Sequence, residues 1–324
     1  MVVKTEKQTQ RGGMFGRLLL ARAAMANQMP NLEPTAFVAR IELYGMDRSA
    51  AGSRMIPSGP RREWNLGTMK TTLIENYAQI LCAPQAPTVR DPHLLMDAKD
   101  GVNIYYAPFE YINPSARIVL VGITPGPTQM VNANNEARRA LLAGQSTAEA
   151  IRAAKNVGAF SGEPLRSNLI KQLNHWGFHT WLGLPDSADL FATARHLVQT
   201  TSLLRYPVFV NDDDYRGIPD MTKHPLLRKL LLENFVAEVE ELQDAVFVGL
   251  GPSVQKVLSN LIQQRVLKPE RVIGGMLHPS GNCTYRINYL ISERMAPVPH
   301  ATNPVPYDHG RRAFRERFLL TCSP

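Results

Sequence analysis

Two short segments of the chain combine glycine, proline and a hydrogen-bonding side chain directly after an apolar run. The first is Gly122-Ile123-Thr124-Pro125-Gly126-Pro127-Thr128-Gln129, and the second is Leu277-His278-Pro279-Ser280-Gly281-Asn282. Glycine lets a backbone approach a ligand closely, and proline fixes φ and removes a donor. Taken alone, the first segment is more typical of a structural turn, and a single histidine is more often structural than catalytic. Their chemistry therefore depends on whether the fold brings them together.

Apolar runs and amphipathic stretches alternate along the chain after residue 70. We predict strands over Ile118–Val121, Leu197–Leu203, Ala245–Val248 and Val272–Met276, and an extended stretch over Val102–Tyr106. The predicted helices cover Thr72–Cys82, Glu136–Lys155, Leu165–Trp176, Pro225–Gln243, Ser253–Gln264 and Arg312–Leu320. This alternation indicates an α/β fold with a parallel sheet covered on both faces.

In such sheets, ligands gather at the carboxyl ends of the strands. The two glycine- and proline-containing segments follow the first and last predicted strands, so we expect them to face each other across a cleft. The first segment is too rich in glycine and proline to continue as a strand or to begin a regular helix.

The paired motifs Gly-x-x-Pro-Gly (Gly122 to Gly126) and His-Pro-Ser (His278 to Ser280) resemble those of the uracil-DNA glycosylase superfamily. The segments Gly158–Gly162, Leu165–Leu169, Val198–Leu204 and Phe247–Pro252 are similar to the family's intervening elements in order and spacing. The layout is closest to the single-strand-selective monofunctional uracil glycosylases. The resemblance implies a three-layer sandwich with a central four-stranded parallel sheet over residues 69–324. We expect DNA as the partner, a monomer, no cofactor and no metal.

The resemblance also implies a role for each matching residue. The enzyme would flip a base out of the DNA and hold it in a pocket, and His278 would donate a hydrogen bond to the pyrimidine O2. The pocket would be formed by Gly122, Ile123, Pro125, Gly126, Phe160, Thr200 and Thr201. Phe160 would stack on the base, although core packing explains a phenylalanine equally well. Pro279, Ser280, Gly281 and Asn282 would contact the DNA backbone.

Two positions depart from the family pattern. Thr124 stands where relatives carry Asp, Asn or Glu to hold the attacking water; threonine can orient a water but is no general base near neutral pH. Thr201, or Thr200 if the register differs by one, stands where related enzymes read uracil with an asparagine. The smaller side chain and the missing amide predict a modified pyrimidine as substrate. By the resemblance, this is plausibly a glucosylated hydroxymethylcytosine of phage DNA, removed as a defence activity.

Other functions stay open. An ordinary uracil-excising repair enzyme and a non-catalytic DNA-binding descendant share the motifs, and a small-molecule nucleoside hydrolase could use the same sheet. Because neither motif contains a lysine, a Schiff-base lyase is disfavoured, and a monofunctional hydrolase that leaves an abasic site is expected.

Charge and composition fit a nucleic-acid partner. The chain has 324 residues with a net charge of +8, and +5 of this lies in residues 1–68, with ten Lys/Arg against five Asp/Glu. Polyanions favour such a segment, although solvated tails share this composition. We expect residues 1–68 to be a loosely ordered extension, with a possible helix at Phe15–Met25 and a strand at Phe37–Leu43. Met69 is an alternative start.

Several remaining features have mainly structural interpretations. No apolar run approaches the length of a membrane span, which favours a cytoplasmic location. The resemblance implies a bacterial or phage-related context. Cys82, Cys283 and Cys322 are too few for a disulfide framework or a zinc site. We expect Asn132, Asn134 and Asn135 to cap a helix, although they could replace the missing amide. The Asp212-Asp213-Asp214 run predicts a solvated turn and His224 a loop residue. Arg311, Arg312, Arg315 and Arg317 predict a basic surface.

Overall fold

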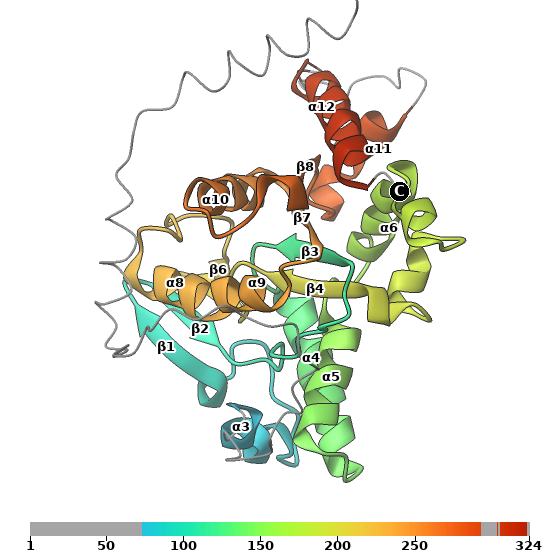
Figure 1. Cartoon of the computed structure of the whole chain (residues 1–324). Coiled ribbons are helices and arrows are strands. Elements are labelled where there is room, and N and C mark those ends of the chain that lie inside the picture. The colour runs from blue at the N-terminus through green and yellow to red at the C-terminus, as the bar shows by residue number, and fades with distance from the viewer. Residues whose placement is uncertain (1–72, 293–302, 304, 323–324) are drawn as a thin grey trace, which may run out of the picture. The chain divides into compact units, whose positions relative to one another are not determined.

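The computed structural model describes residues 73–292, 303 and 305–322 (Figure 1). The helix expected at Phe15–Met25, the strand expected at Phe37–Leu43 and the whole of residues 1–68 lie outside the described residues.

A four-stranded parallel sheet forms the centre of the fold. Its strands are β3 (Ile118–Gly122), β4 (Val198–Ser202), β7 (Val246–Leu250) and β8 (Val272–Met276), in the order β4-β3-β7-β8. Each neighbouring pair is parallel. Every residue of β3 and β7 is buried, as expected of central strands covered on both faces. The α/β class and all four predicted strands are confirmed.

Helices surround this sheet, as Figure 1 shows. Their bounds are α3 (Leu73–Leu81), α4 (Pro127–Leu142), α5 (Thr147–Gly158), α6 (Leu165–His175), α7 (Phe178–Leu182), α8 (Pro225–Leu230), α9 (Ala237–Glu241), α10 (Pro252–Gln263), α11 (Thr284–Ile291) and α12 (Val305–Cys322). A π-helical segment, Leu231–Val236, joins α8 to α9. Apart from the stretch Glu136–Lys155, the predicted helices are confirmed within a few residues, except that α12 begins earlier. No helix within the described ranges is long and apolar enough to cross a membrane.

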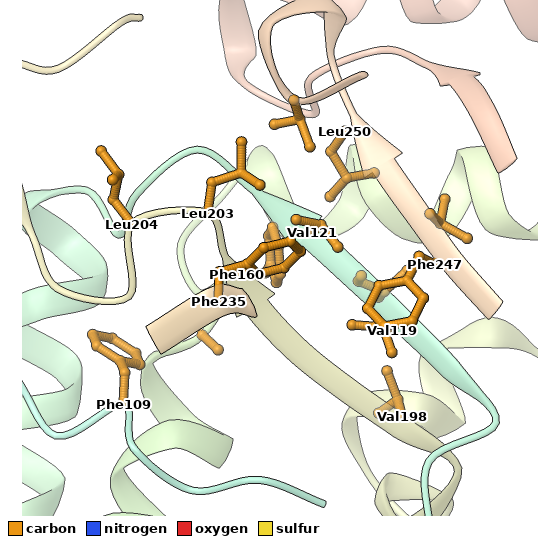
Figure 2. Packing of buried hydrophobic residues seen from close by; sticks show 14 of the residues in the cluster. Phe109, Val119, Val121, Phe160, Val198, Leu203, Leu204, Phe235, Phe247 and Leu250 are labelled. Atoms are coloured by element: carbon orange, nitrogen blue, oxygen red, sulfur yellow. The ribbon is translucent and has the colours of Figure 1, made fainter. Parts of the chain in front are cut away.

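The core lies between the sheet and these helices. Val119 and Val121 of β3 and Phe247 of β7 are buried there together with Phe235 of the π-helical segment (Figure 2). On β7, Gly249 allows α10 to approach closely, since an added Cβ would lie 2.9 Å from Leu258 Cδ1. Close packing of this kind fixes the sheet whose strand ends carry the two motifs.

The single helix predicted over Glu136–Lys155 is wrong, because the chain breaks there into α4 and α5. Gly144 has a φ of +77°, which the helix cannot continue through. Ser146 then caps α5: its side chain accepts from the Glu149 N–H while the Glu149 carboxylate accepts from the Ser146 N–H. Gly144 therefore ends α4, and Ser146 begins α5.

The expectation that the first motif cannot begin a helix is also wrong. Gly126 is extended and forms the N-cap of α4, and Pro127 is the first helical residue. Proline suits this position, because its fixed φ is helical and its missing N–H would have no partner within the helix. Gly122 itself still belongs to strand β3. The irregular part of the motif is therefore only Ile123 to Gly126.

A second, antiparallel sheet adjoins the first motif. It has the order β1-β2-β5-β6, with β1 (Leu95–Lys99), β2 (Val102–Tyr105), β5 (Val208–Val210) and β6 (Asp213–Asp214). Only the stretch that became β2 was predicted as extended. β5 and β6 are too short to show a sequence period. This sheet matters for the site because β5 contacts the first motif.

Candidate functional site

The first motif is held by the connection between β4 and β5. The parallel pairing continues past the strand ends, since Leu203 N donates to Gly122 O and Leu204 N to Ile123 O, each at 2.9 Å. The Thr124 hydroxyl donates to Tyr206 O at 2.9 Å and accepts from Val208 N at 3.1 Å. A hydroxyl has one proton and two lone pairs, so one lone pair of Thr124 is left to hold a water. The Thr124 hydroxyl thus links the first motif to the backbone of Tyr206 and Val208. Its role in placing a water stays a prediction.

A small pocket lies beside this motif and the end of β4. It encloses about 250 Å³ including its mouth and is lined by Phe109, Pro125, Gln129, Lys155, Ala159, Phe160, Thr200, Thr201, Ser202 and Arg205. The structure therefore brings together four of the predicted pocket residues. The enclosed part of this space has room for about one water molecule, so a pyrimidine ring enters only when the lining side chains move apart.

The other predicted pocket residues border this space without lining it. A Cβ at Gly122 would lie 3.4 Å from the Phe160 ring and 3.3 Å from Ser202 Oγ. Ile123 is partly buried against the core, and a Cβ at Gly126 would meet no atom within 4 Å. A side chain at Gly122 would therefore press lightly on Ser202 and touch the Phe160 ring.

Phe160 combines both of its expected roles, because it is buried and also faces the pocket. Its φ of +49° is uncommon for a non-glycine residue, and the ring is 6% exposed. Gln129 Oε1 accepts from Phe160 N at 3.0 Å, and Arg166 Nε donates to Phe160 O at 2.9 Å. The Arg166 guanidinium lies 4.3 Å from the centre of the Phe191 ring. These contacts hold the backbone of Phe160 in its unfavourable conformation.

Strand β4 presents its two threonines differently. Thr201 is buried, and its hydroxyl donates to Glu238 Oε2 at 2.9 Å. Thr200 is half-buried and lines the pocket. The hydroxyl of Thr201 is thus committed to the protein, and the alternative register, in which Thr200 reads the base, fits this geometry better.

His278 follows β8 at the same edge of the sheet, although it does not line the pocket just described. Its Nδ1 accepts from the Ser280 backbone N–H at 3.3 Å, so the proton of the neutral ring belongs on Nε2. Burial lowers the pKa of His278, which favours the neutral ring at pH 7. Gly251 has a φ of +94°, and a Cβ there would lie 3.1 Å from His278 Cβ. The site therefore presents a neutral N–H donor.

Two buried amides of α6 hold the backbone on both sides of His278. Gln172 Nε2 donates to Leu277 O at 3.1 Å, and Leu277 N donates to Gln172 Oε1 at 3.0 Å. Asn168 Nδ2 donates to Pro279 O at 3.1 Å. Sequence reasoning missed this role. The available signal was a pair of amides four residues apart on a helix face with the apolar Leu169 and Leu173.

The predicted DNA-contacting residues divide by exposure. Pro279 is buried and Ser280 half-buried, whereas Gly281 and Asn282 are exposed at the start of a 3₁₀ turn. The neighbouring Tyr285 is 74% exposed. A contact with a macromolecule at this loop therefore falls to Gly281, Asn282 and the turn that follows.

A buried group of charged side chains lies behind the pocket, and sequence reasoning missed it. The Glu238 carboxylate accepts from Arg205 Nη2 at 3.0 Å and from Gln199 Nε2, and it lies 3.9 Å from Lys155 Nζ. Lys155 also donates to Tyr111 O. Burial lowers the pKa of Lys155 to about 8, although Glu238 and Glu110 act in the opposite direction. The absence of lysine from the two motifs therefore does not exclude a Schiff-base lyase, since α5 brings Lys155 to the pocket.

Glu110 lies close to the same charges. Burial raises its pKa, while Tyr106, Arg205 and Lys155 act in the opposite direction. Its two carboxylate oxygens are buried without a hydrogen bond of ordinary geometry. The region behind the pocket thus holds two carboxylates and two cations.

The remaining predictions have mixed outcomes. Asn132, Asn134 and Asn135 do not cap a helix, because α4 begins before them; Asn132 Nδ2 donates to Ser161 Oγ at 2.9 Å, and Asn134 is buried. The three residues Asp212–Asp214 are exposed as predicted, but only Asp212 lies in a turn, because Asp213–Asp214 form strand β6. Across the described ranges, no cluster of three or more His, Cys, Asp or Glu is placed to hold a metal.

The last two predictions concern the residues around α8 and α12. His224 directly precedes α8 as its N-cap. Arg311 Nη2 donates to Tyr289 O at 3.0 Å and Arg317 Nε to Val272 O at 3.1 Å, which leaves Arg312 and Arg315 as the exposed part of the predicted basic surface.

The fold and the site define an α/β protein with a small pocket and a histidine loop at the carboxyl edge of one parallel sheet. The chain is 35% identical over 200 residues to a Bacillus subtilis (strain 168) protein described as "Uncharacterized protein YoxB", and the match covers 61% of this chain and 77% of that protein. The chain belongs to the same family as YoxB. No protein-family profile matches it, and no solved structure matches it.

Proposed function

We propose that this protein is a monofunctional DNA glycosylase with a uracil-DNA glycosylase-like fold, which removes an abnormal pyrimidine and leaves an abasic site. One observation carries the proposal: a neutral histidine with its proton on Nε2 stands at the edge of the sheet that also holds a small, phenylalanine-lined pocket. This combination matches what excision of a flipped base requires.

In this proposal His278 donates to the O2 atom of the base. As the bond between the sugar C1′ and the base N1 stretches, negative charge grows on O2, and a positioned donor in a dry site is worth about 3 kcal/mol. A neutral ring suits the task, because its lowered pKa leaves a donor that need not transfer its proton. Asn168 and Gln172 donate hydrogen bonds to the backbone on both sides of His278 and so maintain the position of that donor.

Water then adds to C1′ after bond breaking has advanced. The free lone pair of Thr124 can accept a hydrogen bond from this water, but the threonine cannot act as its base. The proton of the water passes to solvent. This mechanism requires that departure of the base, and not activation of water, determines the rate.

The shape of the surroundings supports a substrate with a bulky substituent, such as glucosylated hydroxymethylcytosine. A larger groove of about 1530 Å³ including its mouth borders the pocket and shares Lys155, Ala159 and Thr200 with it. Its lining includes Arg139, Arg152, Arg195 and Glu149, which can hydrogen-bond to sugar hydroxyls. The ring would occupy the pocket, and the substituent would extend into the groove.

Mass spectrometry of bases released from DNA tests the proposal. Oligonucleotides carrying uracil, hydroxymethylcytosine or its glucosylated form are incubated with the wild type, His278→Ala and the matched control His93→Ala, whose imidazole is exposed and paired with Asp91. We expect release by the wild type and the control and loss in His278→Ala. No release of any base by the wild type would contradict the activity and leave a DNA-binding descendant, while release of uracil alone would indicate ordinary repair.

The groove has a separate test. Ala153→Phe fills the groove from α5 at a half-buried position that does not line the pocket. Its control, Val157→Phe, adds the same ring at an exposed position of α5 that lines neither space. We expect Ala153→Phe alone to reduce release of the glucosylated base while release of unmodified hydroxymethylcytosine is unchanged. Equal effects on both substrates would refute the assignment of the groove to the substituent.

A further inference from the structure

The end of the pocket next to β4 contains two positive side chains. Lys155 comes from α5 and Arg205 from the connection between β4 and β5, and both line the pocket. Their side chains are only 3% and 11% exposed. A buried cation is costly unless its charge is compensated or used, so each contact of these two groups is informative.

The protein accounts for part of this donor capacity. Lys155 Nζ donates to Tyr111 O and faces Glu238 at 3.9 Å, which leaves one of its three N–H groups without a partner. Arg205 binds Asn234 and Glu238 through its two terminal nitrogens. Arg205 Nε is buried without a hydrogen-bond partner. Lys155 and Arg205 therefore each keep a donor that no protein group satisfies.

The residues that line the pocket include no carboxylate. Glu238 is engaged by Thr201, Gln199, Arg205 and Lys155, and Glu110 lies behind the lining residues. The two phenylalanines, Phe109 and Phe160, supply apolar surface. A ligand that satisfies this site is a flat ring whose edge carries hydrogen-bond acceptors and accumulates negative charge.

We propose that Lys155 and Arg205 contact the N3 edge of the bound pyrimidine and stabilise it as a leaving group. This inference rests on the proposed glycosylase function and names the groups that replace the missing asparagine contact. The bond between C1′ and N1 breaks, and its electron pair goes to the base. Lys155 donates a proton to N3 of a cytosine-type base, which departs neutral, and the lysine recovers a proton from solvent. Water supplies the hydroxyl at C1′ and releases one proton.

A cytosine-type base needs this contact more than a uracil-type base, because its anion is the poorer leaving group. His278 acts at O2, whereas Lys155 and Arg205 act at the neighbouring N3 edge of the ring. The charged and titratable groups that face Lys155 are Glu238 from α9, Arg205 from the connection after β4 and Glu110 from the connection after β2. The pKa of about 8 keeps Lys155 mostly protonated at neutral pH and makes it a better acid than an exposed lysine.

The test is single-turnover base release from single-stranded oligonucleotides that carry 5-fluorouracil, uracil or 5-hydroxymethylcytosine. The variants are Lys155→Met, which keeps the length of the side chain, and the control Lys171→Met at an exposed position of α6. We expect Lys155→Met to slow release of the poorest leaving group about 100-fold or more, with a smaller effect on 5-fluorouracil and none in the control. Equal slowing of all three bases, or no slowing, would overturn the proposal.

Two further measurements keep the proposal falsifiable if Lys155→Met does not fold. In the wild type, the ratio of uracil to 5-hydroxymethylcytosine release should rise as the pH increases above about 8, where Lys155 loses its proton; a constant ratio would overturn the proposal. Thermal-shift titration with free cytosine, whose N3 accepts a hydrogen bond, tests the contact without catalysis. Binding by Lys155→Arg within a few fold of the wild type would support it, and equal binding by a folded Lys155→Met would refute it.

The base-release and base-binding measurements distinguish failure of the Lys155 contact from failure of the glycosylase function. If the wild type releases no base but binds free cytosine through Lys155, the glycosylase function fails and the contact stands. If base release occurs and is insensitive to Lys155, the contact fails and the function stands.

Discussion

The buried lysine predicts an unusual pH dependence of stability. An unfolded lysine has a pKa of about 10.5, whereas burial lowers the pKa of Lys155 in the folded protein to about 8. Between these pH values the folded protein has released a proton that the unfolded chain still binds. The contribution of Lys155 therefore makes the free energy of unfolding rise with pH in this window, and it is constant below and above it.

The magnitude follows from the two pKa values. A tenfold difference in proton affinity corresponds to about 1.4 kcal/mol, so the change from 10.5 to about 8 corresponds to about 3 kcal/mol. Lys155→Met removes this contribution. It leaves Glu238 paired with Arg205, so the variant is expected to fold.

The assay is urea unfolding of the wild type and Lys155→Met at a series of pH values from 7 to 10.5. Subtracting the two curves cancels the contribution of the buried tyrosines, whose raised pKa values destabilise the folded state only above about pH 10. We expect the difference to increase by about 3 kcal/mol across this range, whereas Lys171→Met should follow the wild type. Parallel curves for the wild type and Lys155→Met would refute the view that Lys155 is buried as a charged group.

Four further predictions address the two motifs and the extension. His278→Ala should lower base release by about 100-fold or more with DNA affinity within a few fold, because the histidine acts on transition-state charge; equal losses in both would contradict its role. Gln172→Leu leaves Leu277 N–H and O without their partner and should cost about 2–3 kcal/mol in urea unfolding and slow base release, while the exposed Gln264→Leu should change neither. Thr200→Asn should shift the ratio of uracil to modified-base release, whereas Thr201→Asn should mainly destabilise through its lost bond to Glu238; no shift by Thr200→Asn would show that β4 does not read the base. Removing residues 1–68 should leave a folded protein by circular dichroism with weaker, less salt-dependent DNA binding, and aggregation would show that these residues belong to the core.

The central sheet could be predicted from sequence because its strands are buried on both faces. Ile118–Val121 and Val272–Met276 are nearly continuous apolar runs, and each is followed by a glycine- and proline-rich loop. The break between α4 and α5 was missed because alanines and charged residues continue across it with helical spacing. The cap at Ser146 and the left-handed Gly144 decided the boundary against that pattern.

The charged half of the site could not be predicted, because its members are far apart in the sequence and look ordinary there. Lys155 and Glu238 each lie in a helical stretch rich in other charges, where a lysine or glutamate is normally solvated. Only the packing of α5, α9 and the end of β4 brings them together behind the pocket. By contrast, the histidine loop was identifiable because proline, serine and glycine follow His278 directly.

The two parts of the site also impose a condition on each other. In the proposed mechanism, positive charge for the departing base comes from Lys155 and Arg205, which Glu238 partly compensates. A protonated His278 at the same edge would add a third cation to a region shielded from water, and repulsion between like charges would oppose it. Burial already lowers the pKa of His278, and the bond from Ser280 N–H to Nδ1 favours the neutral ring. A neutral donor at O2 beside a charged pair at N3 is therefore the distribution of charge that this site can hold at neutral pH.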